Sequence, residues 1–134
     1  NLPYNKKFFS RLSLLLLILG LGFHENSYTL FAFLVASICL LNISNSKSKW
    51  NGYFLSTYII ISLVPFLIVN GILTGYPDVE NSPVWYNTSE IIGFRVLNII
   101  PIEDFFYSFI LFYFNVSLFE FYSSKIVRYE DKRD

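Results

Sequence analysis

The apolar residues of this chain gather into four long runs, and these runs constrain its fold more than any other feature. They cover about residues 8–23, 27–43, 53–73 and 102–122. Each run is close to the roughly 20 residues that an α-helix needs to cross the hydrocarbon core of a bilayer. Clustering of this kind favours a membrane protein over a soluble domain with a dense core. The sequence therefore predicts an all-α fold, a polytopic bundle of about four transmembrane helices.

Composition supports this class and argues against several others. Charged residues make up 15% of the chain, against roughly 25% in an ordinary soluble domain. The formal net charge is zero, so nothing points to a nucleic-acid partner. One cysteine, Cys39, and one histidine leave no intrachain disulfide and no cluster of metal ligands. The sequence contains no phosphate-binding loop or dinucleotide fingerprint, so we predict no metal and no cofactor.

The first two runs differ in how they are expected to cross the membrane. The first is short for a span unless it includes Phe8 and Phe9 and lets Arg11 extend toward the membrane surface. The second carries Ala32 and Ala36, small residues one helical turn apart, which suit close packing against another helix.

The third run carries two residues that are unusual at membrane depth. Pro65 lies inside it and is expected to kink the helix or leave a carbonyl without its partner. Asn70 lies near its end, where Asn70-Gly71 can also be helix-ending chemistry. The segment 74–101 that follows is rich in turn formers but too apolar for disorder. We expect an ordered loop folded back over the membrane face, with a short interfacial helix as one form it can take.

Basic residues are divided unevenly between the two ends of a four-span bundle. Nine of the ten fall before the first span, between the second and third, or after the fourth, so all nine share one side. The tenth, Arg95, lies in the 74–101 loop on the opposite side. Positive charge collects on the cytoplasmic side of membrane proteins. We therefore predict an integral membrane protein in which both ends of this segment are cytoplasmic.

Two adjacent acids, Glu103 and Asp104, stand where the fourth run begins. Pro101 before them suits the first position of a helix, which places both acids in the first helical turn. They can simply cap that helix, an effect worth roughly 0.3–1 kcal/mol each. They can also be catalytic, because a carboxyl in apolar surroundings tends to keep its proton and to act as a general acid. Both interpretations stay open at this point.

Other polar and aromatic residues are predicted on the same membrane face as the acids. Arg95 lies eight residues before Glu103 and can pair with either acid, or contact a lipid headgroup instead. The remaining candidates can bind substrate or stabilise a cation through aromatic faces, or act as interfacial anchors. They are Trp85, Tyr86, Asn87 and Asn70.

Four blocks in a fixed order resemble a known family. They are Gly71-Ile-Leu-Thr-Gly75, Pro83-Val-Trp-Tyr-Asn87, Gly93-Phe-Arg-Val96 and Ile100-Pro-Ile-Glu-Asp-Phe-Phe-Tyr107. Together they resemble the membrane-type, flavin-free lycopene cyclases, which occur as heterodimeric or fused repeats. The likeness is best over residues 70–120, and Ser108 departs from it where the family pattern has glycine. The resemblance implies that Glu103 and Asp104 are the catalytic acids, and that a bacterial inner membrane is the location.

The resemblance also implies a reaction and a partner. Residues 1–134 look like a single repeat of the C-terminal type, acting as half of a lycopene β-cyclase that converts acyclic end groups of lycopene, or of a related carotenoid, into β-ionone rings. This cyclisation is started by a proton and is redox-neutral, the work of an intramolecular lyase or isomerase. A second homologous repeat is expected upstream in the same chain or as a separate subunit. The absence of an initiator methionine before Asn1 suits the first arrangement.

Two other functions remain as alternatives. A non-catalytic carotenoid-binding or scaffold subunit in the membrane would use the acids only to cap a helix. A small transporter is disfavoured, because its polar groups should lie near the midplane of several spans rather than at one face.

Overall fold

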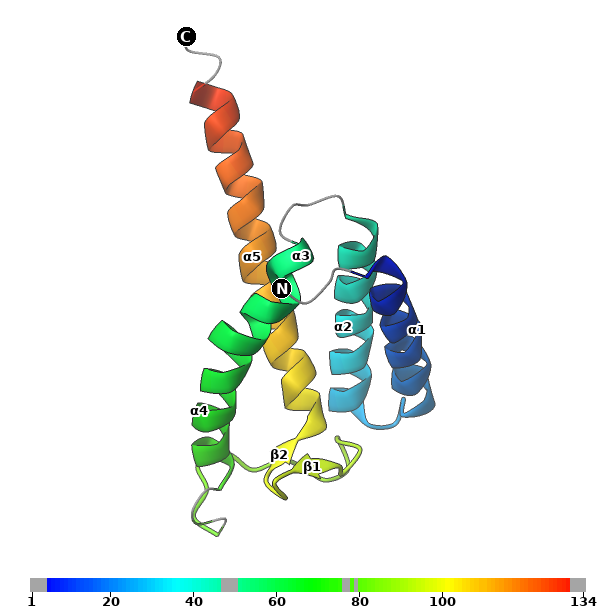
Figure 1. The fold of residues 1–134 in the computed structure, drawn as a ribbon. Coiled ribbons are helices and arrows are strands. Elements are labelled where there is room, and N and C mark those ends of the chain that lie inside the picture. The colour runs from blue at the N-terminus through cyan, green and yellow to red at the C-terminus, as the bar shows by residue number, and fades with distance from the viewer. Residues whose placement is uncertain (1–4, 47–50, 76–77, 79, 131–134) are drawn as a thin grey trace.

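A computed structural model describes residues 5–46, 51–75, 78 and 80–130. Four helical segments form the fold, joined by short turns and one long loop (Figure 1). This architecture confirms the predicted all-α class, with one small hairpin added. The elements are α1 Lys6–Gly22, α2 Ser27–Asn45, α3 Asn51–Thr57, the π-helical turn η1 Tyr58–Leu63, α4 Val64–Thr74, β1 Arg95–Val96, β2 Ile100–Pro101 and α5 Ile102–Glu130.

The helices pack as two pairs that meet along α2 and α5. The α1 and α2 helices form one antiparallel pair, and the continuous helix α3-η1-α4 packs on α5 to form the other (Figure 1). The α2 and α5 helices run in the same direction, and both begin at the end of the molecule that carries the β-hairpin (Figure 1). The first turns of these two helices therefore lie on the same side of the bundle.

Small residues hold α1 against α2. The hydroxyls of Ser13 and Ser37 each donate a hydrogen bond to the backbone carbonyl of the other residue, both at 2.8 Å. Ala32 and Ala36 are 0% exposed, which confirms their predicted role in close helix packing. At Gly20, an added Cβ would lie only 3.2 Å from the Cβ of Phe33. Backbone proximity of this kind is the usual means of helix association in a bilayer.

A π-helical turn, not a sharp break, accommodates Pro65 in the third long helix. The turn spans Tyr58–Leu63, and the N–H of Val64 reaches back five residues to the carbonyl of Ile59. Because proline has no N–H and its ring crowds the preceding turn, a locally widened helix relieves both problems. The helix then continues through Asn70 to Thr74, so Asn70-Gly71 does not end it.

The loop before α5 is ordered, but within its described residues it forms a β-hairpin rather than the interfacial helix that the sequence suggested. Arg95 pairs with Pro101 and Val96 with Ile100 in an antiparallel ladder. The turn between the strands places Leu97 and Asn98 at φ of 53° and 60°. Two consecutive residues with positive φ are typical of the tight hairpin turn whose twist matches that of the strands.

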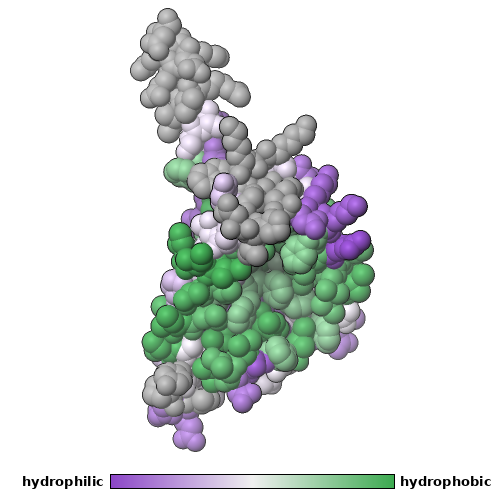
Figure 2. All heavy atoms as spheres, viewed as in Figure 1, coloured by the Kyte–Doolittle hydropathy of each residue, from purple (hydrophilic) through white to green (hydrophobic). Residues whose placement is uncertain are grey.

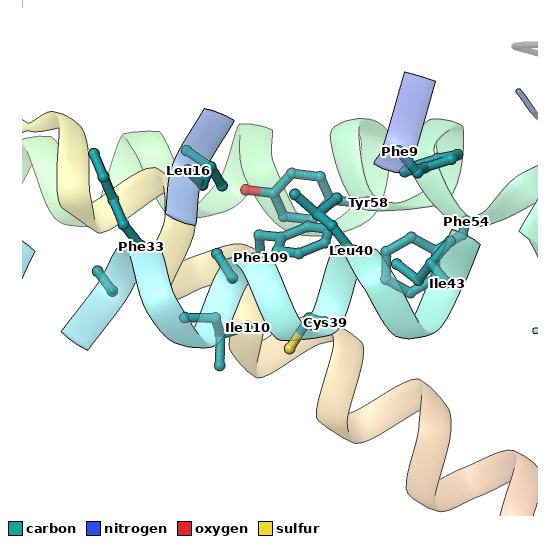
Figure 3. Close-up of a cluster of buried hydrophobic side chains, with 12 residues drawn as sticks. Phe9, Leu16, Phe33, Cys39, Leu40, Ile43, Phe54, Tyr58, Phe109 and Ile110 are labelled. Carbon is teal, nitrogen blue, oxygen red and sulfur yellow. The ribbon is translucent and has the colours of Figure 1, made fainter. Parts of the chain in front are cut away.

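The core lies where the helix pairs meet, and it is rich in aromatic rings (Figure 3). Phe9 of α1, Leu40 of α2 and Phe109 of α5 converge there with Phe54 and Tyr58 from the third long helix. Phe109 makes edge-on contacts with both Phe54 and Tyr58, with ring centroids 5.8 and 5.6 Å apart. Cys39 is buried in the same cluster, as expected for a structural thiol.

Much of the outer surface of the helices is apolar. Ile60, Ile68 and Phe119 are each more than 60% exposed, and Figure 2 shows a broad hydrophobic band with hydrophilic residues gathered above and below it. An apolar surface of this size is typical of a face that contacts lipid or another protein. Among the described residues, three helices are long and apolar enough to cross a membrane: Ser27–Asn45, Tyr53–Thr74 and Ile102–Lys125. The α1 helix, at 17 residues, is shorter than the ~20 that a span needs, and stays a predicted span.

The ends of the helices are consistent with the predicted charge map as far as the described residues extend. The start of α1 meets the end of α2, where the Ser44 hydroxyl donates to the carbonyl of Lys6. Arg95 lies at the opposite end, in the hairpin (Figure 1). Four of the nine basic residues on the predicted cytoplasmic side lie outside the described residues: Lys47, Lys49, Lys132 and Arg133.

The Gly20 contact provides a test of the α1–α2 interface. We expect Gly20→Leu to lower the free energy of unfolding by about 1–3 kcal/mol, because the new side chain overpacks the helix crossing. Gly22→Leu is the matched control, since nothing lies within 4 Å of a Cβ at Gly22. Unfolding in detergent micelles, followed by circular dichroism, measures both. Equal stability of the two variants would contradict the interface.

Candidate active site

The two acids lie at the start of α5 and are buried, Glu103 at 0% and Asp104 at 3% exposure. The start of α5 is fixed by the hairpin, because the helix begins at the residue that follows β2. Pro101 ends β2, and the N–H of Ile102 donates to the carbonyl of Phe94. Pro101 therefore precedes the helix by one residue instead of occupying its first turn. Both acids still fall in that turn, as predicted.

Asp104 accepts hydrogen bonds from three separate segments. The Tyr28 hydroxyl of α2 donates to Oδ1 at 2.8 Å. The Tyr86 hydroxyl of the loop and the Asn70 Nδ2 of α4 both donate to Oδ2 at 2.6 Å. A carboxylate is an acceptor only, so three donors on two oxygens match its ionised form. The first turn of α5 adds the favourable end of the helix dipole.

Glu103 has a different set of contacts. Its Oε1 accepts from the Thr29 hydroxyl at 2.5 Å and from the backbone N–H of Ile92 at 2.8 Å. Its Oε2 is buried and has no hydrogen-bond partner among the residues that the structure describes. A bare, buried carboxylate oxygen is costly, whereas a proton on Oε2 removes its charge. The two neighbouring carboxyls therefore have opposite surroundings: Asp104 accepts from three side chains, and one oxygen of Glu103 has no partner among the described residues.

Tyr86 joins the acids to Arg95. Burial, and next the hydrogen bond to Asp104, raise the pKa of the Tyr86 hydroxyl, which therefore stays a donor at neutral pH. The guanidinium of Arg95 lies over the Tyr86 ring, 5.8 Å from its centroid. Its Nη1 donates to the carbonyl of Ile99 at 3.1 Å. Arg95, Glu103 and Asp104 are all described, and no ion pair joins Arg95 to either acid. Of the two alternatives for Arg95, pairing with an acid is therefore not seen, and its guanidinium contacts the Tyr86 ring instead.

Of the other candidates, only Asn70 reaches the acids. Trp85 is 71% exposed, and its indole N–H donates to the carbonyl of Ser82 at 2.8 Å. Asn87 is exposed, and its Oδ1 accepts from the backbone N–H and the hydroxyl of Ser89. Asn87 thus shapes the turn that leads into the site, while Trp85 lies on the surface of the loop.

Two residues that contact the acids were not predicted from the sequence: Tyr28 and Thr29, on the first turn of α2. Their backbone N–H groups both donate to the carbonyl of Glu90, at 3.1 and 3.3 Å. Asn26 adds two bonds from its Nδ2, to the carbonyls of Ser89 and Ile91. These bonds fasten the start of α2 to the loop. The four-span map had placed the start of the second run on the same face as the acids, and that was the only signal available.

The two tyrosines that donate to Asp104, Tyr28 and Tyr86, are in contact with each other and with a further ring. The Tyr28 ring stacks on Tyr86 with centroids 6.1 Å apart and an interplanar angle of 28°. Tyr107, one helical turn into α5, lies 6.3 Å from Tyr28. Within the described residues, no group of three His, Cys, Asp or Glu side chains is placed to hold a metal ion. Two neighbouring carboxyls in different surroundings are an arrangement that can support general acid–base chemistry.

A known protein family matches most of the chain. The family model for lycopene cyclase matches residues 25–122, which include all four blocks and both acids. The chain belongs to the lycopene cyclase family. Membership supports a carotenoid cyclase function with a carotenoid-related substrate. No curated protein and no solved structure matches the chain.

The Asn70 contact predicts that an apolar substitution in an apolar helix lowers stability. Asn70→Leu should destabilise the fold by about 1–3 kcal/mol, because buried Asp104 loses a donor to its charged form. Asn115→Leu is the matched control: this exposed residue of α5 bonds only to the Leu111 carbonyl of its own helix. Unfolding in detergent compares the two variants. A stabilised Asn70→Leu protein would show that Asp104 is not charged in the fold.

Proposed function

We propose that this chain is the catalytic half of a lycopene β-cyclase, with Glu103 as the general acid and Asp104 as the base. The observation that carries the proposal is the contrast between two neighbouring, buried carboxyls. Asp104 has three donors, and Glu103 has a carboxyl oxygen with none among the described residues. Pairs of titratable groups with opposing environments are how acid and base roles are divided at one pH.

The steps of the cyclisation follow from assigning the acid role to Glu103 and the base role to Asp104. Glu103 gives its proton to C2 of the terminal C1=C2 double bond, leaving a cation at C1. The C5=C6 double bond attacks C1, so the C1–C6 bond forms and the cation moves to C5. Asp104 then takes the proton from C6, and the double bond returns between C5 and C6. One proton is given and one removed, so the step is an isomerisation and needs no redox cofactor.

Electrostatics of the site favour the cation in this sequence. Ionised Asp104 supplies a negative charge in water-excluded surroundings, where its effect is stronger than in solvent. Tyr86 was predicted to stabilise the cation through its ring, but Arg95 already lies over that ring. We assign Tyr86 instead to holding Asp104, and leave Trp85 and Asn87 out of direct substrate contact. After each turnover the proton returns from Asp104 to Glu103 before the next one.

We further propose that residues 1–134 form one transmembrane repeat that works with a second, homologous repeat, in the same chain or as a separate subunit. Much of the surface of the third long helix and of α5 is exposed apolar side chain, which a second repeat or lipid would cover. The β ring type follows from removal of the C6 proton.

One observation favours the alternative of a non-catalytic carotenoid-binding or scaffold subunit. Glu103 is completely buried, so a substrate must displace neighbouring side chains to reach it. In a scaffold, the same contacts would serve only to tie α5 to α2 and the loop. The two functions differ in one respect: only a cyclase would lose carotenoid cyclisation when Glu103 can no longer donate a proton.

The decisive experiment replaces Glu103 by glutamine in the full-length protein, expressed with its partner repeat in cells that accumulate lycopene. We expect Glu103→Gln to reduce formation of cyclised carotenoid by at least about 100-fold, because the amide cannot donate an acidic proton. Pigment extraction and chromatography give the product ratio. Glu120→Gln, several turns further along the same helix, is the matched control and should keep normal activity.

Two results would refute the catalytic assignment. Near-normal cyclisation by Glu103→Gln shows that another group supplies the proton. Unconverted lycopene in cells with the native protein and its partner favours the scaffold function.

The proposed orientation, with both ends cytoplasmic, has a separate test. A reporter that fluoresces only in the cytoplasm, fused after residue 134, should be bright. The same reporter inserted in the exposed turn at residues 88–89 should be dark, because that loop faces the other side. The reverse pattern would contradict the charge-based orientation.

A further inference from the structure

Two neighbouring residues of α2 face two neighbouring residues of α5 across the site. Tyr28 donates to Asp104, and Thr29 donates to Glu103. Because α2 and α5 begin at the same end of the bundle, their first turns lie side by side (Figure 1). Among the described elements, α2 alone supplies a side-chain donor to each acid. Its first turn therefore sets the hydrogen bonds of both carboxyls together.

The Tyr28 hydroxyl is held in place from several directions. Its backbone N–H is bound by the Glu90 carbonyl, and its ring is stacked on Tyr86. Tyr86 donates to Oδ2 of Asp104 while Tyr28 donates to Oδ1, so the two hydroxyls grip opposite oxygens of one carboxylate. A hydroxyl on a ring placed in this way loses little entropy when it forms its hydrogen bond.

From this geometry we infer that Tyr28 is a positioning residue of the cyclisation, which keeps Asp104 ionised and therefore ready to accept the ring proton. The inference rests on the proposed function, since it assigns Tyr28 to the base of that reaction and not to the acid. Nothing in the family comparison or in the sequence pattern assigns Tyr28 a role. Tyr28 acts through Asp104 and makes no contact with the reacting carbons.

The inference fixes the direction of a pH effect. A hydrogen bond donated to a carboxylate stabilises the ionised form. We therefore expect loss of the Tyr28 hydroxyl to move the activity that needs ionised Asp104 to higher pH. The titratable or charged groups that face Asp104 are Tyr28 from α2, Tyr86 and Arg95 from the loop, and Glu103 and Tyr107 from α5; α4 contributes the neutral Asn70.

The test measures kcat and KM against pH for Tyr28→Phe in membranes that contain the full-length protein, its partner repeat and lycopene. Phenylalanine keeps the ring that stacks on Tyr86 and removes only the hydroxyl. We expect kcat near neutral pH to fall about tenfold, with KM unchanged and the acidic limb of the pH profile moved up by about one unit. Activity should recover as the pH is raised. Tyr113→Phe, on α5 among the core rings Phe54 and Phe114, is the matched control.

A second substitution should shift the acidic limb of the pH profile in the opposite direction. It also distinguishes the effect of the hydroxyl from a folding defect. 3-Fluorotyrosine at position 28 keeps the size and stacking of the ring and strengthens its hydroxyl as a donor. The acidic limb should then move to lower pH. A loss of activity in Tyr28→Phe that is uniform across pH, or an unshifted profile in both variants, overturns the inference.

An infrared titration separates failure of this inference from failure of the proposed function. The carbonyl stretch of a protonated carboxyl reports Asp104 directly, whether or not lycopene is converted, and Asp104→Asn identifies its band. Suppose that the native protein does not cyclise lycopene but Tyr28→Phe still moves this band to higher pH. The proposed function is then wrong, while the stabilisation of ionised Asp104 by Tyr28 is supported. If the protein cyclises lycopene and the band does not move, Tyr28 does not stabilise ionised Asp104, and the inference is wrong.

Discussion

The rest of this structure depends on the burial of two carboxyl groups inside an apolar helical bundle. A buried charge is tolerated only when donors surround it, and the first turn of α5 cannot supply enough of them alone. Asp104 therefore draws side chains from α2, α4 and the loop, and Glu103 draws on α2 and the loop. The loop is ordered because the acids and the start of α2 both bind to it. Fold and site are consequences of the same polar contacts.

Capping and catalysis, the two interpretations of the acids, do not exclude one another. The position that lets the helix dipole favour Asp104 as an anion also places Glu103 against Thr29, with its second oxygen in an apolar setting. A helix cap needs no such difference between neighbouring carboxyls. A proton-initiated cyclisation of an apolar polyene does need it, and the family to which the chain belongs carries out a cyclisation.

The sequence predicted what depends on local chemistry and missed what depends on distant pairing. Apolar run lengths placed all four helical segments, and the acids and Asn70 were recognised because polar groups are rare at membrane depth. Tyr28 and Thr29 escaped notice because they lie more than seventy residues from their partners, among ordinary helix-start residues. The sequence left two alternatives for Arg95, an acid partner or a lipid headgroup, and did not indicate the contact with the Tyr86 ring that the hairpin creates. That hairpin depends on positive φ at Leu97, which the sequence does not reveal.

The π-helical turn in front of Pro65 also decides where Asn70 points. Each residue of an α-helix advances the side-chain direction by about 100°, so an extra residue taken up in a widened turn rotates everything after it by that amount. Asn70 lies after the turn and bonds to Asp104 from its rotated position. A regular α-helix through the same residues would turn this amide away from α5 and toward another face of the bundle. Pro65, through the π-helical turn that accommodates it, thus helps to orient Asn70 toward Asp104 on α5.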